Sequence, residues 1–367
     1  MAWIVAATHG NQETINYLEP VIIPVCPVCN HVTFLESQCW DSGWAAIGFD
    51  HRSMQFVRAP VEGVGDIDGG RLIRCSNWDR KCNWMLRETD EAAQCFSCRL
   101  TRRRPDSDDT LAMERLADAE VDKRRMLIQL FALGLPVTPY DERPGGLAFD
   151  LISSYSGESV MIGHADGVIT IDLAEGLDVH RERLRVYLGE AYRTMLGHFR
   201  HEVGHYYEQV LASDEPWLSG TRELFGDETA SYSDAIDRHY TFGAPDDWAD
   251  HYISEYATMH PWEDFAETFA HYLHITGTLA TAAAAGVVMS PVQGVVSVGG
   301  DVRPLMDYSA ESMERMLDDW HWLSMMFNRV NRTMGQHDLY PFGLPGPVIA
   351  KLAFMHQLVT GSTSSAG

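Results

Sequence analysis

The sequence is poor in lysine, has no cysteine after residue 98 and contains no long run of charge-free apolar residues. Lysine stands at only three of the 28 basic positions, and 52 acidic residues far outnumber the basic ones. The resulting formal charge of -24 repels phosphate backbones and anionic membrane surfaces. General nucleic-acid binding is therefore disfavoured, and we expect no membrane partner.

Two further absences bear on the compartment. The first twenty residues lack the basic start and long apolar core of a signal peptide. A long stretch without Asp, Glu, Lys or Arg, residues 273–300, contains Pro291, several glycines and several hydroxyl side chains. It predicts the end of a helix followed by a loop rather than a membrane span. Together these absences predict a cytoplasmic protein.

The composition that remains is that of a globular protein, with 45% hydrophobic and 22% charged residues over 367 positions. All seven cysteines lie before residue 99, among glycines, prolines and short β-type runs at residues 21–23 and 31–35. We therefore predict the α+β class and three parts. These are a zinc-ribbon (rubredoxin-like) β module over 1–106, a mainly α-helical domain over 107–360 and a disordered Ser/Gly-rich tail over 361–367.

Hydrophobic periodicity predicts the elements of the second part. Helices are expected over residues 111–133, 191–212 and 313–334, and a further helix is expected to begin at Pro261 and end near His274. Two β-like runs, residues 160–162 and 168–171, flank Ala165-Asp-Gly167. They predict a hairpin or an edge pair of strands.

A metal-binding motif, His201-Glu202-Val203-Gly204-His205, lies inside the helix predicted over 191–212. Two histidines four residues apart on a helix point the same way and can bind one zinc ion together. Glu202, beside the first histidine, can then act as general base on a water at the metal. The motif predicts a zinc hydrolase.

A zinc hydrolase needs a third protein ligand and an open fourth position. The metzincin extension would place glycine at 208 and histidine at 211, where this chain has Glu208 and Leu211, so that subclass is excluded. Glu263 and Glu267 offer carboxylates one turn apart on the helix that begins at Pro261. One would bind the metal and the other would accept the outer N–H of a ligand histidine. Their roles can be exchanged on this evidence.

The cysteines fall into two groups. One is a complete set of four thiols, which closes a tetrahedral zinc site and makes it structural: Cys75, Cys82, Cys95 and Cys98. The other has three thiols: Cys26, Cys29 and Cys39. Three nearby residues could supply its missing ligand: His31, Asp41 and His51. The alternative is that this second site binds zinc weakly or is vestigial.

Several segments resemble a known family. Residues 98–102, 163–170, 192–207, 260–274, 331–335 and 339–342 are similar to the bacterial zinc-binding metallopeptidases that carry an N-terminal zinc ribbon. The resemblance spans roughly residues 22–359. In addition, Glu263-Asp-Phe-Ala-Glu267, preceded by Tyr256 and His260-Pro261, resembles the third-ligand helix of gluzincin-type peptidases related to anthrax lethal factor.

The resemblance implies a zinc peptidase that acts on a protein or peptide substrate, with one catalytic zinc and one or two structural zincs. It implies a role for each residue of the site: His201, His205 and Glu263 as ligands of the catalytic zinc, Glu202 as general base and Glu267 as the partner of a ligand histidine. Gluzincins of this type carry a tyrosine seven residues before the ligand glutamate, where it stabilises the tetrahedral intermediate. Tyr256 stands at that offset from Glu263. The chain departs from the family at Cys39-Trp-Asp-Ser42, where a second Cys-x-x-Cys is expected.

A locally basic segment supports an alternative function. Residues 71–105 carry nine basic and four acidic side chains, a net charge of +5. A non-catalytic binding or regulatory protein could use it to recruit a protein or nucleic-acid partner through the zinc ribbon, with Arg102, Arg103 and Arg104 in contact. We favour the interpretation that these arginines dock on the acidic remainder of the same chain.

Overall fold

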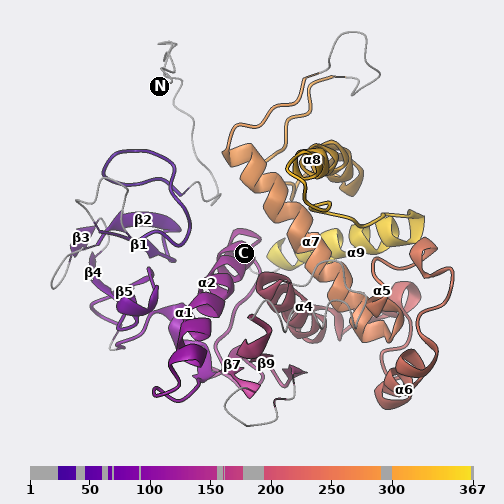
Figure 1. The fold of residues 1–367 in the computed structure, drawn as a ribbon, viewed down its shortest axis with the longest axis horizontal. Helices are drawn as coiled ribbons and strands as arrows, with labels where there is room; N and C mark the ends of the chain where they lie inside the picture. The colour runs from indigo at the N-terminus through magenta and orange to yellow at the C-terminus, as the bar shows by residue number, and fades with distance from the viewer. Residues whose placement is uncertain are drawn as a thin grey trace.

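The computed structural model describes residues 24–38, 46–59, 65–67, 70–90, 92–154, 160, 162–176, 194–290 and 300–364 (Figure 1). A small β module comes first, and a mainly helical domain with a four-stranded sheet follows it. The predicted α+β class is confirmed. Cys39, residues 21–23 and residues 365–367 lie outside the described residues, and so do the predictions made for them.

The N-terminal module is built from short strands in two antiparallel sheets. The first sheet pairs β1 (Ile47–Asp50) with β2 (Gln55–Arg58). The second has the order β3 (Gly65–Ile67), β4 (Gly70–Arg74) and β5 (Met85–Arg87). The 3-10 turn η1 (Trp78–Arg80) follows β4, and the one-turn helix α1 (Phe96–Arg99) closes the module. Of the run predicted at 31–35, only a single bridge forms, between Val32 and Val25.

The larger sheet belongs to the helical domain but begins in the module. Its order is β6 (Thr101–Arg103), β7 (Ala148–Ile152), β9 (Val168–Asp172) and β8 (Gly163–Ala165). The first three strands are parallel, whereas β8 pairs antiparallel with β9 and forms one edge. Strand β6 lies before residue 106, the predicted end of the module. The chain leaving the module therefore contributes a strand to the sheet of the next domain.

The β8–β9 hairpin corrects one boundary. We predicted its first strand at 160–162, but the paired residues are Gly163–Ala165. Ala165 pairs with Val168, so Asp166 and Gly167 alone make the turn, with φ values of 48° and 82°. Such a two-residue turn draws the pairing up to its own flanks. A side chain at Gly167 would also collide with the carbonyl oxygen of Gly145.

Most of the second domain is helical (Figure 1). Its longer helices are α2 (Thr110–Ala132), α4 (Met195–Tyr207), α5 (Trp217–Phe225), α6 (Tyr232–Phe242), α7 (Pro261–Ala284), α8 (Met313–Thr333) and α9 (Gly346–Ser364). Shorter turns are η3 (Leu173–Gly176), the π-helical η4 (Glu208–Ala212), η5 (Trp248–Asp250) and η6 (Tyr256–Thr258). In the described part of the chain, no helix has both the length and the apolar character needed to cross a membrane.

The predicted helix boundaries held for some helices and failed for others. The helices expected over 111–133 and 313–334 are confirmed to within one residue at each end. The prediction that the helix from Pro261 ends near His274 was wrong, because buried Ile275, Leu279 and Ala282 extend its apolar face to residue 284. Gly286, with φ of 71°, then ends it. At the C-terminus, α9 continues to residue 364, four residues into the segment expected to be a tail.

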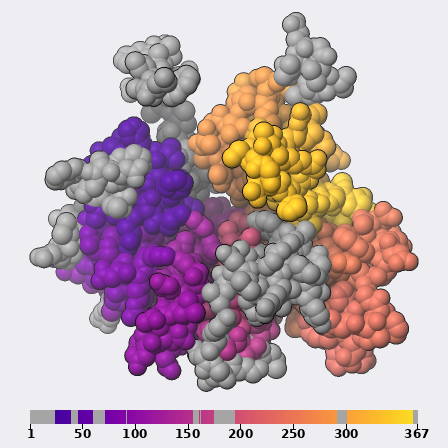
Figure 2. Space-filling view, viewed as in Figure 1, coloured from indigo at the N-terminus to yellow at the C-terminus, as the bar shows by residue number. Residues whose placement is uncertain are grey.

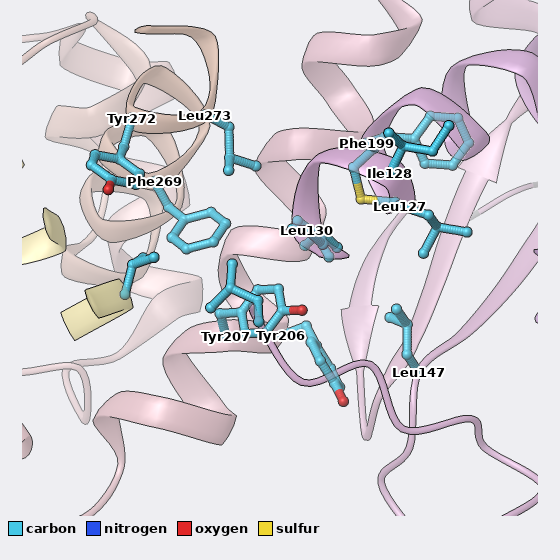
Figure 3. Packing of buried hydrophobic residues seen from close by; sticks show 14 of the residues in the cluster. Leu127, Ile128, Leu130, Leu147, Phe199, Tyr206, Tyr207, Phe269, Tyr272 and Leu273 are labelled. Atoms are coloured by element: carbon cyan, nitrogen blue, oxygen red, sulfur yellow. The ribbon is translucent and has the colours of Figure 1, made fainter. Parts of the chain in front are cut away.

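Helices α4 and α7 pack directly against each other at the centre of the domain. A Cβ atom on Gly204 would lie only 2.8 Å from the Cα atom of Ala266, so this close approach requires glycine inside the His-Glu-Val-Gly-His motif. Beside that contact, the rings of Tyr207 and Phe269 stack with centroids 5.3 Å apart (Figure 3). The tight packing fixes the relative position of two helices whose polar side chains face each other farther along.

Helix α2 connects the module to this core. Leu127 and Leu130 on one side are fully buried in the domain (Figure 3). On the other side, the fully buried Lys123 ammonium donates to the carbonyl of Ser97 at 2.9 Å and pairs with Glu120 at 2.8 Å. Arg124 donates to the carbonyl of Lys81 at 2.7 Å. In the space-filling view, the module and the α5–α6 segment lie on opposite sides of the visible face (Figure 2).

Several basic side chains of residues 71–105 pair with acidic residues beyond the module. Arg102 donates to both carboxylate oxygens of Asp150, at 2.9 and 2.6 Å. Arg99 pairs with Asp141 at 2.9 Å, and Lys81 pairs with Asp118 at 2.5 Å. The locally positive charge is thus partly neutralised within the molecule.

Candidate active site

The two histidines of the motif lie on the face of α4 that meets α7. The helix begins where the Thr194 hydroxyl accepts a hydrogen bond from the Gly197 N–H at 2.9 Å. From this start, His201 and His205 are separated by about one turn, and their rings are 4.9 Å apart. Both side chains are buried. The helix therefore holds the two imidazoles in a fixed relation to each other.

The carboxylates come from the first two turns of α7. His260 caps this helix by accepting the Trp262 N–H at 3.1 Å, and Pro261 occupies its first position. Glu263 and Glu267 follow one turn apart, and both contact side chains of α4. Because only 2% of Glu263 is exposed, its charge needs a cationic or hydrogen-bonding partner.

One oxygen of Glu263 meets both histidines. Its Oε2 atom lies 3.0 Å from Nε2 of His201 and 3.5 Å from Nε2 of His205. The ligand atoms of these three residues all lie within 4.8 Å of one another. Four ligands placed tetrahedrally about 2.0–2.2 Å from a zinc ion are separated by about 3.3–3.6 Å. The three side chains therefore fit a zinc ion, with room for a fourth ligand.

Glu267 lies behind His201, on the far side of its ring from Glu263. His201 Nδ1 donates to Glu267 Oε1 at 2.7 Å, and the Ser254 hydroxyl donates to Glu267 Oε2 at 2.6 Å. The Ser254 oxygen in turn accepts the N–H of Ala257 at 3.1 Å. This chain of hydrogen bonds fixes the tautomer of His201 and leaves its Nε2 atom available to a metal. The arrangement is the one expected if Glu263 binds the metal and Glu267 orients a ligand.

The Glu202 carboxylate has one occupied oxygen and one open oxygen. Its Oε1 atom lies 3.2 Å from His198 Nε2, whereas Oε2 is buried and has no hydrogen-bond partner among the described residues. Burial raises the pKa of this carboxyl, but the His198 hydrogen bond and the imidazoles of His201 and His205 outweigh it and hold the pKa below its usual value. Glu202 is thus ionised at neutral pH, and its open oxygen can accept a proton.

A cleft of about 620 Å³ opens onto these residues. One wall is formed by Ile162, Gly163 and His164, which lead into and form the edge strand β8. Aromatic side chains form much of the remaining surface: Tyr232, Tyr240, Trp248, Tyr252, Tyr256 and Trp262. Since the cleft reaches both Glu202 and the three converging ligand atoms, a molecule in it can contact the metal position directly.

Two further histidines of the cleft, His164 and His271, are uncharged at neutral pH. Burial lowers the pKa of His164 to about 4, and it also lowers the pKa of His271 to about 4. His164 Nε2 accepts the Gly167 N–H at 3.1 Å, and His271 contacts the Tyr340 hydroxyl at 2.7 Å. No arginine or lysine of the described residues lines the cleft. Its charged groups outside the metal site are therefore few and acidic, with Glu255 at the rim.

Two tyrosines lie next to the metal position. The Tyr256 ring is 5.8 Å from the His201 ring, and burial raises the pKa of its hydroxyl, which stays a proton donor. The Tyr232 hydroxyl donates to Glu263 Oε1 at 2.7 Å. Tyr256 was expected near the metal on the resemblance described above, whereas Tyr232 was not expected.

The second metal position lies in the N-terminal module. All four of its thiols are buried: Cys75, Cys82, Cys95 and Cys98. The Cys82 sulfur lies 3.6 Å from those of Cys95 and Cys98, close to the about 3.8 Å between thiolates that share a tetrahedral zinc ion. The Cys95 N–H also donates to the Cys75 sulfur at 3.3 Å. Four protein ligands leave no position for a substrate.

The first cysteine group is described only in part. Cys26 and Cys29 lie on one tight turn, in which the Asn30 N–H donates to the Cys26 carbonyl at 2.9 Å. Cys39 and Asp41 lie outside the described residues. Of the other ligand candidates, His51 stacks between Trp84 and Phe96, with ring centroids 5.5 and 5.2 Å away. Its ring thus packs in the aromatic interior of the module.

Comparison with known protein families matches residues 112–358 to the family described as "Putative zinc-binding metallo-peptidase" and residues 24–109 to a zinc-ribbon domain. The chain belongs to this metallopeptidase family. Proteins of Mycobacterium bovis and Mycobacterium tuberculosis, both titled as uncharacterized, are 45% identical to it over 338 residues, which is 91% of this chain and 94% of theirs. No solved structure matches the chain.

Membership of the zinc-binding metallopeptidase family confirms the resemblance drawn from the sequence and the zinc ribbon at the N-terminus. The converging groups on α4 and α7 lie within the family's 112–358 region, and the four thiols lie within the ribbon. Ser254 and Tyr232 were missed because nothing in their local sequence marks them. Their contacts bridge 13 and 31 positions to α7, so only the tertiary fold brings them to the site.

Proposed function

We propose that this protein is a zinc-dependent peptidase that hydrolyses peptide bonds at the base of the α4–α7 cleft. One observation carries the proposal. Three ligand atoms of His201, His205 and Glu263 converge at the cleft, and the buried Oε2 atom of Glu202 beside them has no partner among the described residues. A structural zinc site would have four protein ligands and no cleft, as the non-catalytic alternative requires.

The chemical role of each residue follows from its position in the site. Bound at His201, His205 and Glu263, zinc would polarise the peptide carbonyl and lower the pKa of a water in its open position. Glu202 takes a proton from the attacking water and then passes it to the leaving amine. Tyr256 donates its hydroxyl to the developing oxyanion, a contact that strengthens in the transition state. A structural zinc at the four buried thiols makes one catalytic and one structural ion, with a second structural ion if the Cys26 group is complete.

The edge strand β8 supports a peptide substrate. Gly163 and His164 line the cleft, and the side of β8 away from β9 has no strand partner among the described residues. An extended peptide can add to such an edge through main-chain hydrogen bonds whatever its sequence. This would align several residues of a substrate across the metal position.

The aromatic side chains that line the cleft support a preference for apolar side chains among extended peptide substrates. Trp262 lies 5.5 Å from the His205 ring and is 38% exposed, so it is available to a side chain next to the scissile bond. With Tyr232 beside it at 6.2 Å, it forms an apolar surface without a basic residue nearby in the cleft lining. We expect extended peptides with large apolar side chains to bind best and acidic peptides to bind poorly.

Replacing Trp262 by alanine tests this preference. The loss of one aromatic contact of about 1–2 kcal/mol should raise KM for an aromatic-containing peptide about tenfold. Phe242→Ala is the matched control, because Phe242 is 80% exposed on α6 and does not line the cleft. Equal KM values for the two variants, measured by steady-state kinetics, would refute the proposed contact between Trp262 and the substrate.

Metal removal tests the proposed function itself. Incubation with a chelator should abolish hydrolysis of an unfolded protein, and added zinc should restore it in proportion to the metal bound at His201, His205 and Glu263. Elemental analysis measures the zinc, mass spectrometry measures the products, and circular dichroism checks that the chain stays folded. Hydrolysis that persists in folded chain without metal at this site would rule the proposal out.

A further inference from the structure

The ligand Glu263 uses its two carboxylate oxygens differently. Oε2 lies 3.0 and 3.5 Å from the ligand nitrogens of His201 and His205, at the metal position. Oε1 accepts a hydrogen bond from the Tyr232 hydroxyl at 2.7 Å. Among the described residues, the Tyr232 hydroxyl is the group that forms a hydrogen bond to Oε1, so it restrains this second oxygen while Oε2 faces the imidazoles.

We propose that Tyr232 is a positioning residue that keeps Glu263 a one-oxygen ligand of the metal. The inference rests on the proposed zinc site and adds a residue that the motif does not contain. A carboxylate free to turn can offer both oxygens to one ion. The second oxygen would then compete for the open position, which the attacking water needs. By occupying Oε1, Tyr232 preserves that opening.

The placement of Tyr232 fits this role. It is the first residue of α6, directly after Ser231, whose hydroxyl caps the helix. Its ring packs edge-on against His260 and Trp262, with centroids 5.3 and 6.2 Å away, and these residues flank the start of α7. The tyrosine is thus held by the same turn of chain that presents Glu263.

Helix α6 itself has no buried residue. Arg238 anchors it by donating to the carbonyls of Thr258 and Met259 at 3.2 and 2.9 Å. Because Tyr232 is 36% exposed, replacing it by phenylalanine removes the hydroxyl while its ring contacts and the fold remain. The same helix offers a matched control in Tyr240, which also lines the cleft but makes no hydrogen bond to the ligands.

The experiment compares Tyr232→Phe, Tyr240→Phe and the wild-type full-length chain, each with the thiolate zinc retained. Zinc affinity at the His201/His205/Glu263 site is measured by competition with a chelator. The same site is then loaded with Co²⁺, whose visible absorption weakens when the number of ligands bound to the ion rises from four to five. For Tyr232→Phe we expect zinc binding about 10–100-fold weaker and a weaker Co²⁺ spectrum. Tyr240→Phe should match wild type in both.

The outcomes distinguish a failure of the positioning role of Tyr232 from a failure of the proposed peptidase function. Wild-type affinity and an unchanged Co²⁺ spectrum in Tyr232→Phe overturn the positioning role and leave the peptidase proposal intact. A wild-type chain that binds no metal at His201, His205 and Glu263 overturns both. A fall in kcat with KM unchanged in Tyr232→Phe, together with the altered spectrum, supports the inference, because loss of a substrate contact would raise KM instead.

Discussion

Replacing Glu202 by glutamine is expected to lower kcat/KM for peptide hydrolysis by about 10²–10⁴-fold, the usual contribution of a general base. The amide has the size of the carboxyl group but cannot accept the proton of the attacking water. In the wild type, His198 Nε2 lies 3.2 Å from Glu202 Oε1, and the glutamine amide can keep this contact. The helix and its two ligand histidines should therefore keep their places. Zinc content should therefore be that of wild type, which separates a lost base from a lost metal.

Glu255→Gln is the matched control for that experiment. Glu255 lines the same cleft, is exposed and lies outside the converging ligands, so its replacement removes one cleft carboxylate without touching the proton path. We expect a change in kcat/KM of less than about threefold, since exposed charges contribute little. Similar losses in the two variants would show that the effect of Glu202→Gln is one of cleft charge, not of proton transfer.

Replacing Cys95 by serine should have the largest effect on stability. The residue is fully buried, and its sulfur and N–H face the other thiols, so a hydroxyl there would be a buried polar group without its metal. Zinc binding supplies about 10–16 kcal/mol in zinc-finger peptides, which is as large as the whole stability of an ordinary domain. We expect the variant to lose its thiolate zinc and the module to unfold.

The damage should spread into the helical domain through α2. Lys123 and Arg124 of that helix donate to the carbonyls of Ser97 and Lys81, on either side of the thiol cluster. Thermal unfolding of Cys95→Ser should therefore begin at a lower temperature for both the N-terminal module and the helical domain. Peptide hydrolysis should be lost in parallel. Ser97→Ala, which changes the neighbouring turn but keeps all four thiols, should bind zinc as wild type does. A Cys95→Ser chain with wild-type zinc content and melting temperature would contradict the structural role.

The ligand set was predictable because it is encoded locally. His201 and His205 share one helix, Glu263 and Glu267 share another, and helical periodicity alone places each pair on one face. The structure adds how the two helices meet. Glu263 faces both imidazoles, whereas Glu267 contacts only the far side of His201, a distinction that equal spacing could not make.

Other features depend on contacts that the local sequence does not encode. Tyr232 begins α6 and Ser254 lies in a loop shortly before α7, and only the folded chain brings them to the carboxylates. The extension of α7 beyond His274 reflects burial against neighbouring helices, where tertiary packing outweighs the threonines and glycine in its sequence. The first strand of the hairpin was misplaced because its register is set by the two-residue turn, not by the apolar run before it.

In the proposed mechanism, Glu202 acts as the general base when water hydrolyses peptide bonds in this cleft. The most direct measurement incubates a denatured bacterial proteome in ¹⁸O-labelled water with wild-type protein or with Glu202→Gln, and identifies new chain ends by mass spectrometry. We expect new carboxyl termini carrying ¹⁸O with wild type, flanked by large apolar residues, and their absence with the zinc-loaded variant. The same set of cleavages in both samples, or none with zinc-loaded wild type, would contradict it.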